Sequence, residues 1–403
     1  MIHSFSCKNF YSFQKNTTVS FVVNENAPIN NGYFKSPSGA RLSKVETVIG
    51  PNASGKTNLL KIVPFLKWII LDSFNINPSA PIPLQPFMFN GLKNKPTELA
   101  VEFEINGNIY LYEFVLNNNR ILSEELKVKN KTKQRVTYKM FFSRHWNEEN
   151  EKYNFEGKNF GLPRGFENLL RSNASVIGSA SRLNHKESQE IAKYWQQVET
   201  NVIEAGWIGD HLLPSATQQL PEVFNFYSEN EVLKKEAEKL LSRFDLGLEG
   251  FEIEKQKQEN GFLLNIRATH LFNGQKYYLP IQYESSGTKQ LFILLKTILQ
   301  VLTKGGVAIL DEFDVNLHPD MVLSLFDLFI QPETNPKNAQ ILFSTHSHLV
   351  LSKLDKYQIV LTEKNKDGSS ESWRLDEMSG VRVDDNYYSK YIAGAYGAIP
   401  KIN

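Results

Sequence analysis

The sequence predicts an α/β fold with a mixed, mainly parallel core sheet, an antiparallel β subdomain and a short helical insertion. Three compact apolar runs are typical of buried strands: Val45–Ile49, Val307–Leu310 and Gln340–Ser344. Apolar residues recur at helical spacing after the first run and on both sides of the second, at 59–66, 289–302 and 321–330. Strands that alternate with helices in this way favour a parallel sheet.

The antiparallel subdomain is predicted from a second pattern, in which apolar and polar residues alternate over residues 98–129. The alternating apolar positions are Leu99, Val101, Phe103, Ile105, Tyr110, Tyr112 and Phe114. Asn106-Gly107 lies between the two series and favours the tight turn of an antiparallel hairpin. Short strands are also expected at 2–5 and 18–23.

The helical insertion is predicted from apolar residues three or four positions apart: Ile191, Trp195, Val198 and Val202. A second helix is expected at 231–244, and the following strands at 250–254, 262–269 and 276–281. These elements divide the chain into three predicted parts: a discontinuous two-lobed head, a helical insertion and a C-terminal tail that packs on the head. Their boundaries are 1–182 with 251–378 for the head, 183–250 for the insertion and 379–403 for the tail.

Composition sets few limits beyond those of an ordinary globular protein. Of the 403 residues 41% are hydrophobic and 22% charged, and the net charge of +1 provides no general attraction to nucleic acid or membranes. Cys7 is the only cysteine, which excludes a disulfide within the chain and fits a reducing compartment. The opening MIHSFSCKNFYSF lacks the apolar core of a signal peptide. We therefore expect a cytoplasmic protein.

A phosphate-binding loop is predicted where the first apolar strand ends. Its pattern GxxxxGK[ST] comprises Gly50, Pro51, Asn52, Ala53, Ser54, Gly55, Lys56 and Thr57. Glycines allow the backbone to wrap around phosphates, so that successive N–H groups face the anion. We expect Lys56 to contact the β and γ phosphates of ATP and the Thr57 hydroxyl to bind Mg²⁺.

Two further motifs follow the other buried strands. Asp311 and Glu312 come directly after the second strand, where Asp311 would bind the metal and Glu312 would polarise a water for attack on the γ-phosphate. Alone, these carboxylates could be a solvated strand end, but the P-loop favours the catalytic interpretation. His346, after the third strand, would donate to the γ-phosphate and sense its loss. The predicted catalytic residues are therefore Glu312, His346 and Lys56.

A third stretch, ESSGTKQ, opens the helix before the second strand. Small residues at a helix N-terminus, here Ser285 and Gly287, can approach a phosphate closely. An ordinary helix cap formed by Ser285 or Ser286 is the interpretation that the local sequence favours.

The order of these motifs resembles the ABC-type ATPase heads of the SMC and RecF class. It is most similar to the smaller prokaryotic AAA-family ATPases of the RloA and AbiL-like group, many of which sit in phage-defence operons. The motifs that carry the resemblance are the P-loop, SSGTKQ, ILDEFD, LHP and STHS, and it extends from CKNFYSF to YIAGAYGAIPKI.

The resemblance implies roles for several residues. Ser285 and Gly287 would form the signature motif that completes the ATP site of a second protomer, Asp314 would lie between the two sites, and His346 would be the switch histidine. The signature departs from the usual LSGGQ at three positions: Glu284, Ser286 and Thr288. A glutamine loop is also implied, with Gln85 and the stretch 178–189 as alternatives.

A basic stretch gives the only sequence support for a nucleic-acid partner. Its charges alternate at Lys127, Lys129, Lys131, Lys133 and Arg135. Alternation on a strand places them on one face, where they could follow a phosphate backbone. A solvated hairpin that keeps a sheet edge soluble is the favoured interpretation.

Three functions are consistent with these patterns. The first is an ATP-hydrolysing switch that dimerises around ATP and controls a separate nuclease or toxin in anti-phage defence. The second is a RecF-like DNA-repair ATPase, although the short insertion lacks the heptads of a DNA-tethering coiled coil. The third is an autonomous nuclease, for which we identify no second metal site.

Overall fold

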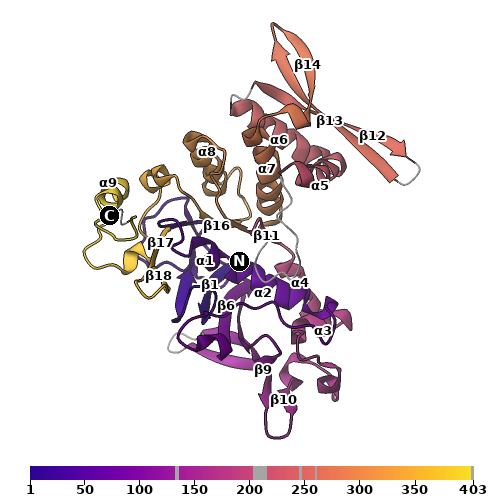
Figure 1. Ribbon diagram of the computed structural model, residues 1–403, viewed down its shortest axis with the longest axis vertical. Helices are drawn as coiled ribbons and strands as arrows, with labels where there is room; N and C mark the ends of the chain where they lie inside the picture. Colours follow the sequence, from indigo (N-terminus) through magenta and orange to yellow (C-terminus); the bar gives the residue numbers. More distant parts are fainter. Residues whose placement is uncertain (132–135, 203–215, 245–246, 259–260, 401–403) are drawn as a thin grey trace.

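The computed structural model describes residues 1–131, 136–202, 216–244, 247–258 and 261–400 (Figure 1). At its centre is a six-stranded sheet in the order β11 (Val198–Thr200), β15 (Val307–Leu310), β16 (Gln340–Ser344), β5 (Val45–Ile49), β17 (Ile359–Lys364) and β18 (Ser370–Arg374). All neighbours are parallel except β17 and β18. The mainly parallel core sheet is therefore confirmed.

The core sheet is buried on both faces because its strands are apolar at successive positions. Ile309 and Leu342 belong to one hydrophobic core, and their neighbours Leu310 and Phe343 to another. The second core is closed by two helices, α7 (Ser286–Lys304) and α8 (Pro319–Ile330). The first is closed by the P-loop helices α1 (Lys56–Leu60) and α2 (Ile62–Leu71) and by a second sheet.

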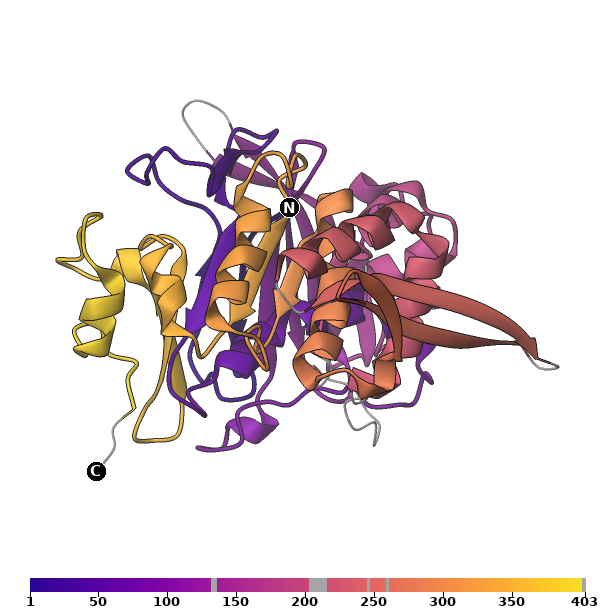
Figure 2. The same cartoon turned by 90° about the horizontal axis from the view of Figure 1, so that it is seen from above.

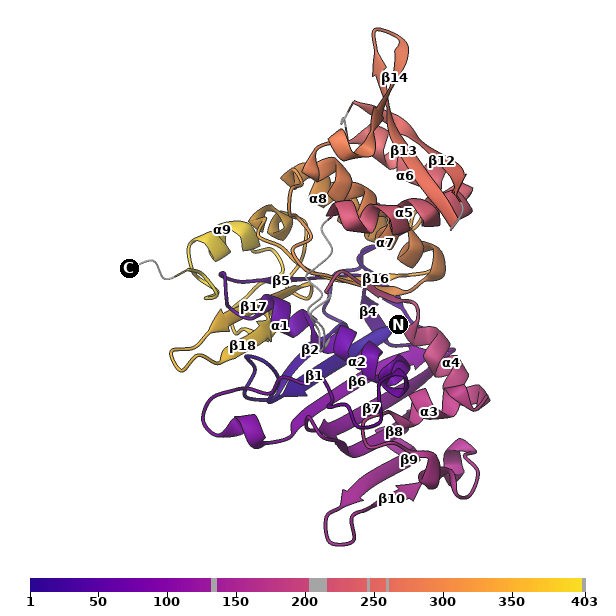
Figure 3. The same cartoon turned by 45° about the vertical axis from the view of Figure 1, so that its right-hand side comes forward.

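That second sheet is antiparallel and lies beyond α1 and α2 (Figure 3). Its order is β10 (Lys152–Glu156), β9 (Val136–Asn147), β8 (Ile121–Lys131), β7 (Asn108–Leu116), β6 (Thr97–Ile105), β1 (Ile2–Lys8) and β2 (Thr17–Ser20). The turn between β6 and β7 is at Asn106-Gly107, as predicted, with φ of 49° and 83°. A small hairpin of β3 (Tyr33–Lys35) and β4 (Arg41–Ser43) lies beside it.

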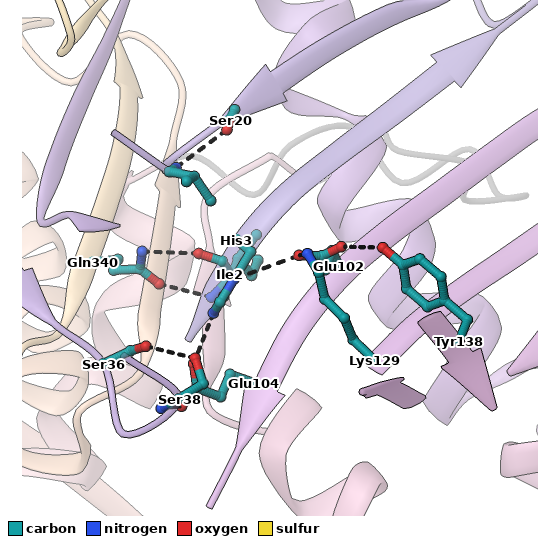
Figure 4. A network of polar contacts seen from close by, with 11 residues as sticks. Ile2, His3, Ser20, Ser36, Ser38, Glu102, Glu104, Lys129, Tyr138 and Gln340 are labelled. Carbon is teal, nitrogen blue, oxygen red and sulfur yellow. Dashed lines mark hydrogen bonds and ion pairs between the residues drawn. The ribbon is translucent and has the colours of Figure 1, made fainter. Parts of the chain in front are cut away.

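A buried polar network joins the two sheets (Figure 4). The Gln340 side chain on β16 accepts from the Ile2 N–H at 2.7 Å and donates to the Ile2 carbonyl at 3.0 Å. The adjacent His3 is only 1% exposed, and its ring nitrogens lie 2.8 Å from Glu104 and 3.6 Å from Glu102. Lys129 completes the network at 2.7 Å from Glu102. The hydrogen bonds of Gln340 thus link the two sheets, whereas the charged side chains of the network join strands within the antiparallel sheet.

This network predicts a pH dependence of stability. Burial lowers the pKa of His3, but hydrogen bonds and charges from Glu102 and Glu104 outweigh it and raise the pKa above 6.5. The resulting stabilisation is complete below pH 6.5 and is lost as the pH rises through the folded pKa. Burial raises the pKa of both glutamates, yet the bonds to His3 and their other partners lower it to about 2. Their contribution is therefore lost only as the pH falls from 4.5 towards 2.

We expect His3→Gln to lower the free energy of unfolding by about 1–3 kcal/mol at pH 6, because it removes a buried charged partner. We also expect the difference from the wild type to shrink between pH 6 and pH 8.5. Urea denaturation at both pH values measures the effect. A difference that is the same at both values would show that His3 does not titrate as proposed.

The third sheet forms a lobe at one end of the molecule (Figures 1 and 3). It contains β12 (Leu248–Gln258), β13 (Gly261–Phe272) and β14 (Gln275–Pro280), and packs with α5 (Ala216–Glu229) and α6 (Glu231–Arg243) around α7. Figure 2 shows β12 and β13 extending to one side of the helices. No helix of the described chain is long and apolar enough to cross a membrane.

Two helix predictions were wrong in detail. The helix predicted through Val202 is α4 (Lys186–Trp195), preceded by α3 (Val176–Arg182), and the chain then becomes β11 because Val198 pairs with Val307 of the core sheet. The helix expected over 59–66 is instead two helices, α1 and α2, that meet at Lys61. Pro64 lies in the first turn of α2, where its missing N–H removes no helical bond. Near the C-terminus, α9 (Tyr387–Ile392) packs on the segment His348–Ser352.

Candidate functional site

A cavity of about 470 Å³ opens beside the P-loop, at the carboxyl ends of the core strands. Its lining residues are Asn52, Ala53, Gly55, Lys56, Thr57, Asn58, Asp311, Glu312, His346 and Lys364. The structure thus brings together most of the predicted P-loop, both carboxylates and the histidine. They meet because β5, β15 and β16 are parallel neighbours whose carboxyl ends share one edge.

The P-loop backbone requires its glycines. Ala53 has a φ of 61° and Gly55 a φ of 113°, in the left-handed region that favours glycine. A Cβ on Gly55 would lie 2.5 Å from the Ser370 Oγ, and one on Gly50 would clash with the Thr362 carbonyl. The loop is therefore seated directly on β17 and β18.

Lys56 is held at the mouth of this loop. Its Nζ donates to the Gly50 carbonyl at 2.8 Å and to the Pro51 carbonyl at 3.2 Å. Burial lowers the pKa of Lys56, and the charges of Asp311, Glu312 and Asp314 oppose the shift. Among the described residues, the partly desolvated Lys56 ammonium donates hydrogen bonds only to these two carbonyls. It is therefore available to bind an anion in the cavity.

Asp311 and Glu312 are positioned by two polar residues, Asn201 and Ser344, for which no role was predicted. Asn201 accepts from the Asp311 N–H at 2.7 Å and donates to its carbonyl at 2.9 Å. Ser344 donates to the Asp311 carboxylate and accepts from the Glu312 N–H at 2.7 Å. Glu312 has a φ of 47°, and its side chain is 56% exposed beside the cavity.

Asn201 carried no recognisable signal, because it follows β11 in the stretch that was predicted to be helical. Ser344 ends β16 and is the first residue of the STHS motif, but only His346 of that motif was given a role. Lys364, which lies at the end of β17 and lines the cavity, was missed because no motif marks that strand.

His346 lies opposite Glu312 across the cavity. Its Nε2 is 3.9 Å from the Glu312 Oε1. Its backbone N–H donates to both carboxylate oxygens of Asp314, at 3.2 and 3.1 Å. Asp314 therefore ties the loop after β15 to the loop after β16.

The residues at the site fit a nucleoside triphosphate with Mg²⁺. The tight, glycine-dependent loop and Lys56 suit phosphate, because the backbone N–H groups of the loop and the Lys56 ammonium both face the cavity. The Thr57 hydroxyl and the Asp311 carboxylate supply the oxygen ligands that Mg²⁺ prefers. Thr57 and Asp311 both line the cavity.

Ser285 and Gly287 do not line this cavity. Ser285 caps α7 by accepting from the Thr288 N–H at 3.0 Å, which is the helix-cap arrangement that the local sequence favoured. A Cβ on Gly287 would lie 2.6 Å from the Asn316 carbonyl, so α7 begins against the loop that contains Asp314. Within one chain, Ser285 and Gly287 therefore lie outside the cavity that the P-loop, the paired carboxylates and His346 line.

The two alternatives for a glutamine loop also lie outside the cavity lining. The Gln85 carbonyl accepts from the Tyr11 N–H at 2.8 Å. Ser12, which follows Tyr11, accepts a hydrogen bond at its hydroxyl from the side chain of Asn58 on α1. In the other stretch, Gln189 donates to the Ser181 carbonyl on α3. Gln85 is therefore the one connected to the P-loop helix.

Lys127 and Lys129 of the basic stretch are both ion-paired. Lys127 contacts Glu125 at 2.5 Å and Glu113 at 2.7 Å, and Lys129 contacts Glu102. Their charges are thus largely neutralised by the same sheet. The side chain of Lys131, together with Lys133 and Arg135, lies outside the described residues.

The chain is similar to one protein family and to several solved structures. Residues 47–352 match the family described as "AAA domain, putative AbiEii toxin, Type IV TA system". No curated protein matches the chain. Similar solved structures include the SMC head bound to the C-winged helix domain of ScpA, at 16% identity, 93% coverage of this chain, 99% of that chain and a TM-score of 0.49. Another is the SMC head domain from Thermotoga maritima, at 14% identity, coverage of 93% and 98%, and a TM-score of 0.41.

The family match spans the P-loop, the paired carboxylates and the histidine, and so contains the whole cavity wall except Lys364. Its extent covers most of the chain. The protein is a member of this AAA-domain family of ATPases.

Proposed function

We propose that the protein is an ATP-gated switch. Two copies would enclose two ATP molecules, each held by the P-loop of one copy and by Ser285 and Gly287 of the other. The dimer would control a separate effector, a nuclease or toxin, in anti-phage defence. The family description, which names a putative toxin of a toxin–antitoxin system, supports a defence setting.

The observation that carries this proposal is the separation of the two half-sites. The cavity is open and holds the phosphate loop, Asp311 and Glu312, whereas Ser285 and Ser286 are exposed at the start of the 19-residue helix α7. Unpaired N–H groups at the start of such a helix favour an anion. A second copy is the simplest source of an anion-binding element for the open cavity.

Each residue then has a defined task. Lys56 binds the phosphates, and Thr57 and Asp311 hold Mg²⁺, which neutralises developing charge on the phosphates when it is bound. Glu312 accepts a proton from the attacking water, and His346 donates a hydrogen bond on the γ-phosphate side. Ser344 and Asn201 keep Asp311 and Glu312 in place.

The composite site predicts complementation between two inactive variants. Lys56→Ala removes the phosphate-binding ammonium, and Ser285→Arg blocks the signature surface at a cost of about 1 kcal/mol for the lost helix cap. We expect each purified variant to have at most about one-tenth of the wild-type ATPase activity. In an equimolar mixture one site of each heterodimer is intact, so activity should return to about a quarter of the wild-type value.

The control is each variant at the same total concentration without the other. Thermal unfolding of Ser285→Arg shows whether the lobe is folded. If the mixture is no more active than the average of its components, the site is complete within one chain and the switch proposal fails. Gel-shift measurements on the same mixture would reveal duplex binding, the RecF-like alternative.

A further inference from the structure

The hairpin of β13 and β14 carries a concentrated exposed apolar surface. We call residues 268–283 the arm. Its exposed large side chains are Leu271, Phe272, Tyr277, Tyr278, Leu279 and Tyr283. Phe272 is 64% and Tyr283 71% exposed. Clusters of this kind are uncommon on a free surface and mark contacts with other molecules.

The register of the arm shows that part of this surface continues a buried face. Ala268 pairs with Leu279, and His270 pairs with Tyr277, so these side chains lie on one face of the hairpin. Ala268 is fully buried in the core of the lobe. Further from that core on the same face, Phe272 and Tyr277 contact each other and are exposed. The core-facing side of the strands thus extends beyond the helices that cover it.

The arm is bonded to the start of α7. The His270 Nε2 lies 2.6 Å from the Glu284 Oε1, and Glu284 directly precedes Ser285. Lys289 on α7 donates to the Gln282 carbonyl at 2.7 Å. Glu284 is the position at which the signature departs from leucine, and the structure shows that its carboxylate pairs with the arm. A displacement of the arm would therefore be transmitted to Ser285.

We infer that the arm docks on a second copy of this chain when the ATP sites close. This inference rests on the proposed function, in which Ser285 reaches the cavity of the other copy. Tyr283 lies two residues before Ser285 and is 71% exposed, so it would lie near that copy as well. Tyr277 and Leu279, on the strand that leads to Tyr283, are also exposed.

The other half-site has an exposed aromatic side chain that would contact the arm. Phe89 is 58% exposed and lies against Gly368 in the turn between β17 and β18. The end of β17 supplies Lys364 to the ATP cavity. Each copy therefore has exposed apolar residues beside its signature segment and beside its P-loop half-site. A two-fold axis would bring the two kinds of surface together twice, in a closed dimer.

The test is ATP-dependent dimerisation in a Glu312→Gln background, which preserves bound ATP. Phe272→Ser with Tyr277→Ser removes both rings from the arm. We expect the dimer Kd at saturating ATP, measured by analytical ultracentrifugation, to rise at least tenfold, while the affinity of the monomer for ATP is unchanged. Leu169→Ser is the matched control, because Leu169 is 56% exposed and lies outside the arm. Its dimer Kd should equal that of the background.

Three results separate the two proposals. An increased dimer Kd with normal ATP binding supports the arm contact. An unchanged Kd in the arm variant overturns it and leaves the ATP dimer intact. A Glu312→Gln protein that binds ATP and stays monomeric overturns both. If the double substitution impairs folding, Tyr283→Ser is measured in the same way, and an unchanged Kd there also overturns the arm contact.

Discussion

Glu312→Gln should reduce the rate of ATP hydrolysis by about 100-fold or more, which corresponds to about 2.7 kcal/mol of lost transition-state stabilisation. The amide cannot accept the proton of the attacking water, whereas it occupies nearly the same volume as the carboxylate. The Glu312 N–H would still bond Ser344, and the left-handed backbone at this position would be unchanged. ATP affinity should therefore stay within about threefold of the wild type.

Phosphate release under saturating ATP measures the rate, and calorimetry measures the affinity. Glu333→Gln is the control, since Glu333 is exposed and does not line the cavity. Wild-type hydrolysis by Glu312→Gln would mean that another group accepts the proton, and the assignment of Glu312 as the base would be wrong.

Lys56→Ala should weaken ATP binding by about 100-fold, or about 2.7 kcal/mol, as expected for the loss of charge-assisted bonds to phosphate. Lys56 is the lysine of the P-loop, and its Nζ bonds only to the loop carbonyls of Gly50 and Pro51 in the described structure. Its removal breaks no salt bridge among the described residues, because the nearest carboxylates act on it only through longer-range charge. The free protein should therefore remain folded.

Titration with a fluorescent ATP analogue measures this loss, and thermal unfolding without nucleotide tests the fold. Lys186→Ala provides the control, because it removes one exposed lysine from the start of α4. Binding by Lys56→Ala that matches this control would show that the cavity does not hold phosphate in the predicted orientation.

The core of the fold was predictable because its signals are local. Val45–Ile49, Val307–Leu310 and Gln340–Ser344 were placed correctly, since strands of a parallel sheet that is buried on both faces are rich in apolar residues and end at polar ones. The same ends carry Asp311 and His346, so the cavity followed from the strand order. The turn at Asn106-Gly107 was predicted from its conformational requirements alone.

The remainder depended on contacts between distant residues. Val198 fits a helical pattern with Trp195, and only its pairing with Val307 makes it a strand. Asn201 acquires its role through the same pairing, because β11 brings it beside Asp311. Nothing near Glu284 in the sequence indicates that its carboxylate bonds the ring of His270, which lies fourteen residues earlier on β13.

The position of β5 between β16 and β17 also determines when the nucleotide site can form during synthesis. The Ser54 hydroxyl bonds Thr362, and the two residues are 308 positions apart. At a ribosomal rate of about 5–20 residues per second, the P-loop is made roughly 15–60 seconds before the strand on which it rests. During that interval the apolar strand Val45–Ile49 has neither of its neighbours. The P-loop therefore gains the support of Thr362 only late in synthesis, once β17 has emerged.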